Sequence, residues 1–475
     1  MTAPPTVVAW RSRLAALARG NLGAMLADNV VLMAMNMAIL VMINRVYARP
    51  GDTTDAGRLA VIISVMLGAV LLTSGGVSRA VVLRLSRVRA AGGEGAGDEI
   101  ARTIGGGVVL AVVLSAALTV LGLAAPWLVH RIVQAGWPEH AAGVASYVGP
   151  FQWAALWVPS YSLLLVMVAV YDGFQQMRWS LWAEAGTFQL LRFVVAAWAM
   201  LAAGLAWGGL VAAWAVAFAA GLVLVALELA WFLRRQRQRV AWTGLPLKGM
   251  LRDAGYLFLP WMAPMLVSQA GVLMAWAGGG AEASAAFWVA WTVAIGAMEL
   301  CLPVGRVLFP AVAALARQAD PQALRRALRL SFWGTSAVML TAFFAVTALK
   351  GWVLAYLNQP GQATVLTVLM AAGFFEVHRT VFNPVLLATG YERILTLLEW
   401  LVLVTILVAG GGAMAAWGLY GLAGVFLVVY VVAAMLRVHL VARATGVRMW
   451  PDVLATAVVV LGVAGAVVAY EASVR

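Results

Sequence analysis

The sequence contains one cysteine, Cys301, and only four histidines among its 475 residues. A single thiol excludes an internal disulfide and any cysteine-based zinc or iron–sulfur site. The histidines lack the spacing of metal ligands, and neither a Walker A sequence nor an HExxH motif occurs. We therefore expect no cofactor, no metal and no enzymatic activity.

Charged residues are also scarce, at 11% of the chain, whereas hydrophobic residues make up 64%. Apolar runs of about 20 residues recur along the chain, which is the length an α-helix needs to cross a bilayer. These runs are continuous and lack the alternation of membrane β-strands. The composition therefore predicts an all-α polytopic membrane protein. In such a protein the net charge of +13 indicates basic loops at a membrane surface and not a nucleic-acid partner.

Glycine, proline and charge clusters divide the apolar sequence into about thirteen predicted helices. These are expected at 22–44, 57–83, 103–125, 146–170, 179–203, 208–233, 251–277, 285–311, 328–349, 363–388, 394–413, 416–440 and 451–470. The basic stretch "VVAWRSRLAALARG" before the first helix is amphipathic and is expected to lie along the inner membrane surface. No cleavable signal peptide is expected, because the first apolar run is long and no small-residue cleavage site follows it.

The distribution of lysine and arginine predicts the orientation. About 22 of them, with Arg437 counted among these, fall on the side of the N-terminus and about 6 on the other side, which indicates a cytoplasmic N-terminus. An odd number of helices places the C-terminus outside. The thirteenth segment is alternatively a re-entrant or interfacial helix.

The two halves of the sequence repeat. The fourth predicted helix ends in "VAVYDGFQQMRW" and the tenth in "PVLLATGYERIL", which aligns Gly173 with Gly390 as tight cytoplasmic turns. The segments "LLTSGGVSRAVVLRLSRV" and "MELCLPVGRVLFPAVAAL" align Arg79 with Arg306. We predict a six-helix lobe at 1–240, a second at 241–446, and an additional helix at 447–475. Transporters commonly bind substrate where such repeats meet.

These motifs resemble the multidrug/oligosaccharidyl-lipid/polysaccharide (MOP) exporter superfamily, and within it the Wzx-type polysaccharide or O-antigen flippases. The resemblance covers nearly the whole chain, although the thirteenth helix departs from the twelve-helix core. It implies two pseudo-symmetric six-helix bundles around a central cavity in a bacterial inner membrane. It further implies a cationic cavity that receives the diphosphate of a polyprenol-linked glycan and exports it by alternating access. Membrane lipids and a polysaccharide assembly complex would be further partners.

Charges inside the predicted spans provide the candidate site residues, because a charge at the bilayer centre costs about 2.5–3.5 kcal/mol unless it faces protein or water. The candidates for substrate binding are Arg79, Arg306, Arg379, Arg192, Asn29, Asn36 and Gln269. The candidates for ion coupling are Glu299, Glu376, Asp28, His378 and Glu184. For Arg79 and Arg306, the alternative is that their side chains extend to the lipid headgroups.

The stretch "FFEVHRTVFNP" brings several of these residues together. Glu376, Arg379, Thr380 and Asn383 share one face of a helix, because they are spaced i, i+3, i+4 and i+7. One interpretation is a self-neutralising Glu376–Arg379 pair with a structural role. The other places this face in the central cavity, with Arg379 available to an anionic substrate. Arg192 and Glu184, about two turns apart, are likewise either a cavity face or a buried pair.

Three other functions are compatible with the sequence. A cation-coupled multidrug exporter predicts an anionic or aromatic cavity instead of a cationic one. A membrane glycosyltransferase or polymerase predicts a large outer loop, whereas the longest one here, around 126–145, has only about 20 residues. A non-transporting scaffold of an exopolysaccharide assembly complex predicts no translocation by the isolated protein.

Overall fold

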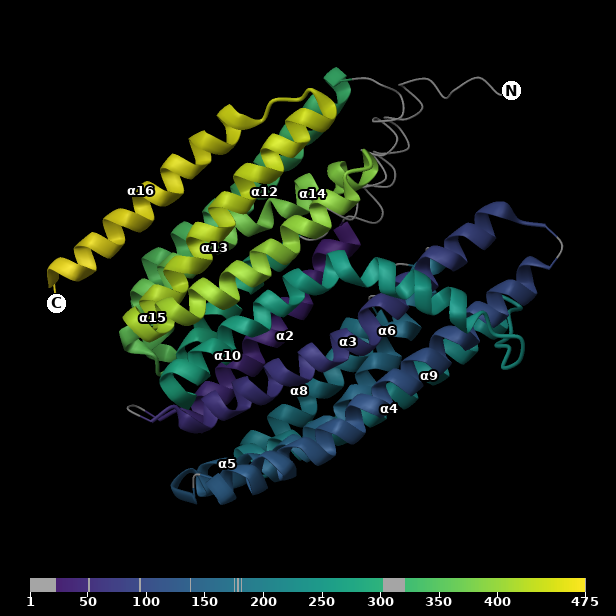
Figure 1. Cartoon of the computed structure of the whole chain (residues 1–475), viewed down its shortest axis with the longest axis horizontal. Helices are drawn as coiled ribbons and strands as arrows, with labels where there is room; N and C mark the ends of the chain where they lie inside the picture. The colour runs from purple at the N-terminus through teal and green to yellow at the C-terminus, as the bar shows by residue number, and fades with distance from the viewer. Residues whose placement is uncertain are drawn as a thin grey trace. The chain divides into compact units, whose positions relative to one another are not determined.

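The computed structural model describes residues 23–49, 52–93, 95–136, 138–174, 176, 179–180, 182–301 and 321–474 (Figure 1). In these ranges the structure is helical apart from loops and one isolated β-bridge, which confirms the predicted all-α class. The first half contains α2 (Gly23–Tyr47), α3 (Thr54–Ala91), α4 (Ala96–Gly136), α5 (Pro138–Ala155), α6 (Trp157–Gly173), η2 (Trp182–Gln189), α8 (Leu190–Ala197), η3 (Trp198–Ala202) and α9 (Trp207–Arg235). The second half contains α10 (Leu247–Glu299), α12 (Pro321–Tyr356), η4 (Pro360–Gln362), α13 (Ala363–Val377), α14 (Arg379–Ala388), α15 (Glu392–Thr445) and α16 (Trp450–Val474).

Eleven helices within the described residues are long and apolar enough to cross a membrane. Two of them, α10 and α15, are interrupted by glycines with non-helical backbone, Gly280 at φ 72° and Gly418 at φ 59°. Glycine adopts such positive φ values without the steric cost that a side chain brings. Each of these two long helices therefore combines two of the predicted spans. The number of thirteen crossings and the orientation stay predictions.

The chain forms two compact units. The first, here called the N-terminal bundle, consists of residues 38–276 and 280–285. The second, the C-terminal bundle, includes the described residues of 1–37, together with 277–279 and 286–475. The predicted lobe boundaries at 240 and 446 stay predictions. The basic N-terminal stretch lies outside the described residues.

In the N-terminal bundle, α3 packs against α4 and α6, and α9 packs against α5, α6 and α8. Small residues let some backbones approach very closely, as is common in membrane bundles. A Cβ added at Gly57 of α3 would lie 1.7 Å from the carbonyl oxygen of Ala281. The hydroxyl of Ser284 donates a hydrogen bond to the carbonyl of Gly57 at 3.1 Å, at the same contact. The start of α3 therefore touches the second part of α10 through backbone atoms.

This contact yields a matched pair of substitutions in one helix. Gly57→Ala is expected to lower the stability of the N-terminal bundle by about 1–3 kcal/mol, because the methyl group forces two backbones apart. Gly68→Ala, where nothing lies within 4 Å of the added Cβ, is expected to be neutral or slightly stabilising. Thermal melts followed by circular dichroism in detergent would compare the two variants. Equal melting temperatures would contradict the contact.

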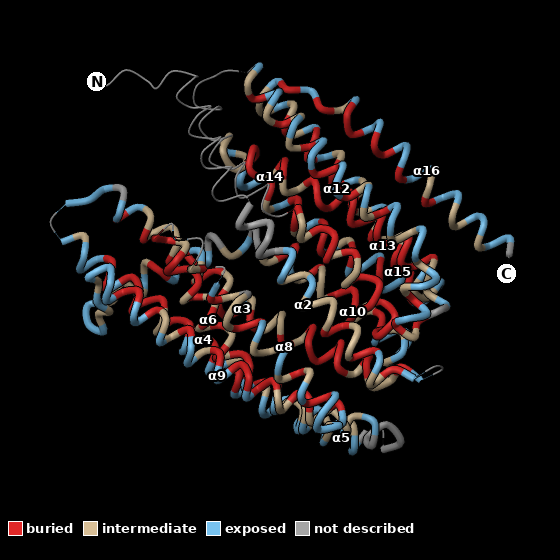
Figure 2. The backbone as a smooth tube through the Cα atoms, turned by 180° about the vertical axis from the view of Figure 1, so that it is seen from behind, coloured by how far each residue is buried: buried red, intermediate tan, exposed pale blue. Residues whose placement is uncertain are grey.

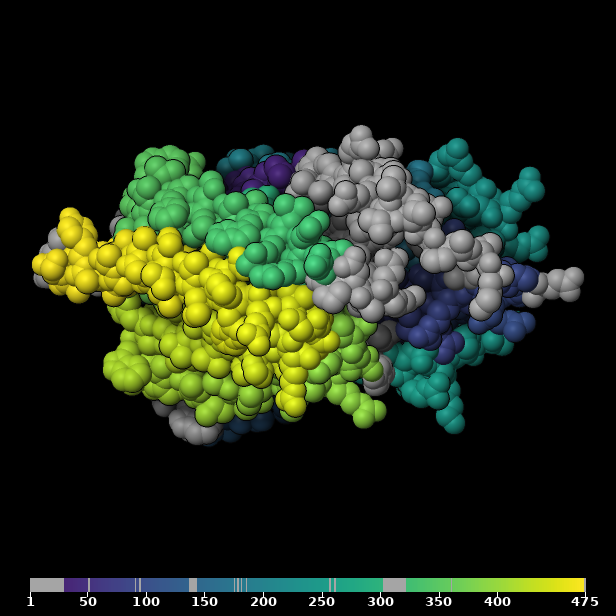
Figure 3. All heavy atoms as spheres, turned by 90° about the horizontal axis from the view of Figure 1, so that it is seen from above, coloured from purple at the N-terminus to yellow at the C-terminus, as the bar shows by residue number. Residues whose placement is uncertain are grey.

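In the C-terminal bundle, α13 is the central element and packs against α12, α15 and α16. The span Ala363–Ala388 is 83% buried, and α13 is red along most of its length in Figure 2. Helix α16 lies along α12 (yellow against green in Figure 3). The Asp452 carboxylate of α16 accepts hydrogen bonds from Arg329 Nε and Trp333 Nε1 of α12, each at 3.1 Å. At the other end of α16, Glu471 bonds to Lys350 and Thr364.

The two aligned turn glycines differ in conformation. Gly390 has φ +82° and lies in the turn between α14 and α15, as predicted. Gly173 is instead the last residue of α6 and is helical, so the prediction of a glycine turn there is wrong. Its missing side chain makes room for Leu85, whose Cβ would lie 2.7 Å from an added Cβ. Packing against α3 therefore explains this glycine.

Candidate functional site

A buried charge cluster joins α13, α14 and α15. Glu376 Oε1 lies 2.9 Å from Arg379 Nε, and Glu376 Oε2 accepts a hydrogen bond from Arg437 Nη1 at 3.3 Å. The second terminal nitrogen of Arg437 donates to Glu399 Oε1 at 2.8 Å. The same carboxylate oxygen accepts a hydrogen bond from Asn383 Nδ2 at 3.1 Å. Arg437 therefore bridges the carboxylates of α13 and α15.

The two carboxylates and two guanidinium groups of this cluster have no net formal charge. The side chain of Arg437 is 0% exposed, and those of Glu376 and Glu399 are 5% and 2% exposed. Charges this deep are stable only when they are paired and hydrogen-bonded, because removal from water costs several kcal/mol per ion. The pairing is therefore a condition for the C-terminal bundle to fold with these residues inside.

The sequence predicted only the local part of this cluster. The Glu376–Arg379 pair expected from "FFEVHRTVFNP" is present, and Asn383 bonds to the same cluster, whereas the choice between a structural and a cavity-lining role stays a prediction. Arg437 is not a cation of the cytoplasmic surface as counted for the orientation, because it is fully buried. Glu399 received no role from the sequence. Glu399 and Arg437 each lie inside an apolar run, and each is a charge without a local partner in the sequence. This lone charge was the signal that could have identified both residues.

His378 lies at the break between α13 and α14, at the residue that belongs to neither helix. Its ring centroid is 4.5 Å from that of Phe332 and 4.8 Å from that of Phe374. Its Nε2 is 2.9 Å from the hydroxyl of Ser336 on α12. These neighbours are aromatic or neutral, so the ring packs as a core residue. A role in proton coupling stays a prediction.

Arg192 lies on α8, between the two π-helical segments η2 and η3. Its Nη1 donates a hydrogen bond to Gln189 Oε1 at 3.2 Å, and its guanidinium carbon is 5.0 Å from the centroid of the Trp214 ring. Arg192 therefore lies against an aromatic ring and an amide.

The remaining candidates are spread over several helices. Arg79 is exposed on α3, whereas Arg306 falls within 302–320, outside the described residues. The side chains of Asp28 and Asn29 are likewise outside the described part of α2. Three further candidates are half-buried: Asn36, Gln269 and Glu299. In the described part of the chain, acidic, histidine and cysteine side chains form no group of three or more that is able to hold a metal ion.

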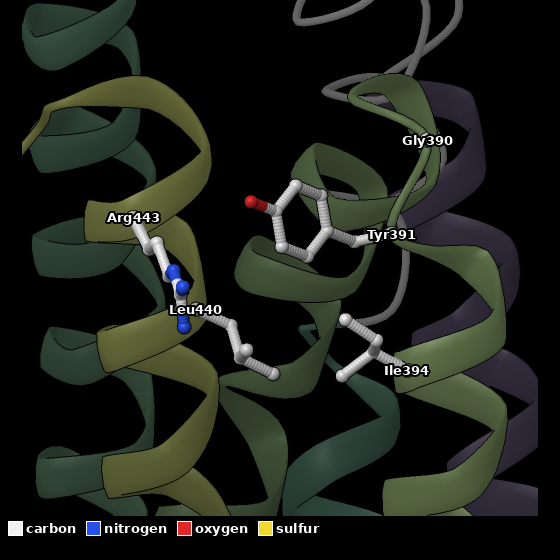
Figure 4. Close-up of a pocket in the computed structure, with 5 residues that line it drawn as sticks. All are labelled: Gly390, Tyr391, Ile394, Leu440 and Arg443. Carbon is white, nitrogen blue, oxygen red and sulfur yellow. The ribbon is translucent and has the colours of Figure 1, made fainter.

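A pocket of about 320 Å³ opens where α15 begins and ends (Figure 4). Gly390, Tyr391 and Ile394 line one side of it, and Leu440 and Arg443 line the other. Its polar groups are the Tyr391 hydroxyl and the Arg443 guanidinium, above the aliphatic side chains of Ile394 and Leu440. The sequence predicted the turn at Gly390 but not this pocket.

No protein-family profile matches the chain, and no curated protein does. Solved structures do match it. An inward-facing structure of a multidrug resistance MATE family transporter of the MOP superfamily is 14% identical, with a TM-score of 0.70 over 88% of this chain and 98% of that chain. A MATE structure in complex with MaD3S is 14% identical, with a TM-score of 0.65 over 90% and 97% of the two chains.

A third structure is a MOP superfamily transporter from Pyrococcus furiosus, 15% identical, with a TM-score of 0.63 over 90% of this chain and 97% of that chain. In that protein, the reversed polarity of the binding pocket suggests a different function. The structural similarity establishes the fold, but sequence identities this low leave the substrate open. The matches extend over most of both chains in each case. The chain is therefore an all-α membrane protein with the fold of the MOP superfamily transporters.

Proposed function

We propose that this protein is an alternating-access exporter that carries a polyprenyl-diphosphate-linked oligosaccharide across the bacterial inner membrane, for surface or exopolysaccharide biosynthesis. The fold supports a transporter, because the matching MATE and MOP structures are transporters. The single observation that favours an anionic cargo is the charge of Arg79, an exposed arginine within a membrane-spanning helix.

The position of Arg79 supports a functional role. Twelve residues separate it from the end of α3 at Ala91, a distance of about 18 Å along the helix axis. The segment "AVVL" that follows it is apolar. A guanidinium group remains charged at all physiological pH values and binds phosphate oxygens through two parallel hydrogen bonds. Arg79 is therefore suited to the diphosphate of a lipid-linked glycan, with Arg306 as the proposed partner from the second repeat.

The charge cluster of the C-terminal bundle agrees with this proposal. A carrier of cationic drugs needs carboxylates that are available to its cargo. The two carboxylates buried in α13 and α15 are instead held by Arg379 and Arg437. Export of the glycan would draw on an ion gradient or the membrane potential, for which Glu299 and Asp28 remain candidate coupling groups.

Multidrug export is the second candidate, and the MATE structures among the similar proteins favour it. The purified protein in liposomes distinguishes the two functions. We expect it to translocate a fluorescent short-chain polyprenyl-diphosphate oligosaccharide, measured by loss of protection from a membrane-impermeant quencher. Translocation of a lipophilic cationic dye, with no movement of the glycan lipid, would favour multidrug export and reject the proposal.

The same assay tests the other classes. Chromatography of the recovered glycan lipid is expected to show an unchanged covalent structure. A lengthened or transferred glycan would indicate a glycosyltransferase or polymerase. Liposomes that translocate neither probe would favour a scaffold within an assembly complex.

A further inference from the structure

The pocket between the two ends of α15 lies at the boundary of a membrane span. The apolar segment extends from Glu392 to Thr445 and is interrupted at Gly418. The residues that line the pocket come from the turn before this segment and from its first and last turns, so both ends of α15 lie at the same end of the C-terminal bundle. The ends of spanning helices lie at the level of the lipid headgroups. The pocket is therefore at the depth of the phosphate groups of a bilayer.

Two polar side chains face this pocket from opposite sides. Figure 4 shows the Tyr391 hydroxyl pointing toward the last turns of α15, where the Arg443 guanidinium lies. The ion pairs between described residues include Arg437 of the same helix but not Arg443. The described lining of the pocket also contains no carboxylate. It therefore offers a cation and a hydroxyl group to an anionic ligand.

The surface around the pocket is positively charged. Tyr391 packs against a core cluster that includes Leu324 of α12 and Val447 after α15, so the start of α12 and the loop after α15 lie at the same end of the bundle. Asp452 is neutralised there by Arg329 at 3.1 Å. Within the described part of these segments, the exposed charged residues are Arg325, Arg326, Arg393, Arg443, Arg448 and Glu392. This excess of positive charge attracts anionic headgroups.

Two apolar stripes lead from the pocket along α15. In its first part, Ile394, Leu397 and Leu401 are exposed and share one face, because they are spaced i, i+3 and i+7. In its second part, the exposed Leu436 lies one turn before Leu440. Ile394 and Leu440 both line the pocket, so the two stripes meet there. A hydrocarbon chain attached to a headgroup in the pocket would therefore continue along exposed apolar side chains.

We propose that an anionic phospholipid binds in this pocket, with its phosphodiester between Arg443 and Tyr391 and an acyl chain along the stripe that begins at Ile394. A guanidinium group binds phosphate oxygens through paired hydrogen bonds, and the tyrosine hydroxyl is able to donate another. The volume of about 320 Å³ is in the range of small-ligand sites and leaves room for the glycerol beside the phosphate.

The charge of the lining selects the kind of lipid. One guanidinium group matches the single negative charge of a phosphodiester, whereas a diphosphate carries more charge than the described lining neutralises. A zwitterionic headgroup would place its ammonium group among the surrounding arginines, where it would be repelled. We therefore expect phosphatidylglycerol to bind and phosphatidylcholine not to bind. This site lies in the C-terminal bundle and does not depend on the proposed export function.

Lipid added to the purified protein in a neutral detergent tests the site. Phosphatidylglycerol is expected to raise the melting temperature by about 2–5 °C, because a ligand that binds only the folded state stabilises it. Native mass spectrometry should show a single retained phosphatidylglycerol. Equal retention of phosphatidylcholine would overturn the proposal of an anionic ligand. Displacement of the lipid by glycerol 3-phosphate would show a site for soluble phosphates and would likewise overturn the proposal.

Arg443→Gln is expected to lower the affinity for phosphatidylglycerol at least tenfold, because it removes the charge and the paired donors. Tyr391→Phe, which removes one hydrogen bond, should lower it by about two- to fivefold. Arg393→Gln is the matched control, since Arg393 is exposed near the start of α15 but does not line the pocket. It should retain nearly all of the affinity. An equal loss in Arg393→Gln and Arg443→Gln would assign the binding to general surface charge and reject the site.

If Arg443→Gln does not fold, a phosphatidylglycerol with a photoreactive acyl chain decides on the unaltered protein. Its crosslinks are expected on Leu397, Leu401 and Leu436. Crosslinks distributed equally over the exposed faces of α12 and α16 would overturn the proposal. Failure of glycan export in liposomes would leave these results unchanged, and failure of phosphatidylglycerol to bind would leave the export assay unchanged.

Discussion

Replacing Arg437 by methionine is expected to destabilise the C-terminal bundle by about 3–5 kcal/mol, which is the usual cost of breaking a buried ion pair from one side. Arg437 donates to Glu376 and to Glu399, and its side chain is 0% exposed. The substitution leaves Glu399 with only the amide of Asn383 and leaves Glu376 with only Arg379. Two carboxylates would then share a buried site that has a single cation.

The single cysteine offers a specific probe for this measurement. Cys301 belongs to the C-terminal bundle and is 1% exposed, so a thiol-reactive dye should label it only when this bundle unfolds. Arg437→Met should shift the labelling transition to a lower temperature. Arg393→Met, at an exposed position near the start of α15, is the matched control and should change stability by less than about 0.5 kcal/mol.

A triple variant separates the loss of a charge from the loss of packing. Replacing Glu376 and Glu399 by glutamine in the Arg437→Met background removes both unpaired carboxylates. This variant should recover a large part of the stability lost in the single variant, because uncharged polar groups are less costly to bury. If Arg437→Met and Arg393→Met unfold at the same temperature, the cluster does not stabilise the bundle.

Much of the fold is predictable because the lipid bilayer restricts each spanning segment to a helix. In a bilayer each spanning segment satisfies its own backbone hydrogen bonds, so long apolar runs form helices wherever they occur. The described boundaries of α9 and α16, for example, lie within a few residues of the predicted 208–233 and 451–470. The interruption at Gly280 falls in the predicted gap between 251–277 and 285–311, whereas the one at Gly418 falls two residues inside the predicted helix 416–440. At Gly173 a glycine at the end of a predicted span did not mark a turn, because glycine is favoured both in turns and at close helix–helix contacts.

The charge cluster shows the limit of the sequence. Glu376 and Arg379 are three residues apart, so helical periodicity alone predicts their contact. Arg437 is 61 residues from Glu376 and 38 residues from Glu399. The first contact depends on how α15 packs against α13, and the second on how the two parts of α15 meet on either side of Gly418. Because Arg437 is near the end of a predicted span, the charge count assigned it to the membrane surface. From a single sequence, an arginine buried between helices near the end of a span looks the same as an arginine at the membrane surface.

The two alternatives for Glu184 and Arg192, a buried pair or a cavity face, stay predictions. They assumed α-helical spacing, in which eight residues correspond to roughly two turns. The segment Trp182–Gln189 is π-helical, so the angle between the two side chains differs from the α-helical one. Arg192 contacts Gln189 and Trp214.

Reversal of charge at Arg79 is expected to reduce export of the glycan lipid at least tenfold, which corresponds to about 1.4 kcal/mol of lost binding. Glutamate at this position would repel the diphosphate that arginine is proposed to bind. Arg79→Lys should retain part of the activity, because it keeps the charge but loses the paired hydrogen bonds to phosphate oxygens. Initial rates in the liposome assay, normalised to the amount of inserted protein, provide the measurement.

Arg87→Glu is the matched control for this substitution, since Arg87 is also exposed on α3 and lies two turns closer to the end of the helix. If a general loss of positive charge at the membrane surface were responsible, both variants would lose export equally. If Arg79 contacts the cargo, only Arg79→Glu should do so, and reversing Arg306 as well should abolish export while the protein still inserts. Unimpaired export by the double variant would remove these two arginines from the binding site and, with them, the main argument for an anionic cargo.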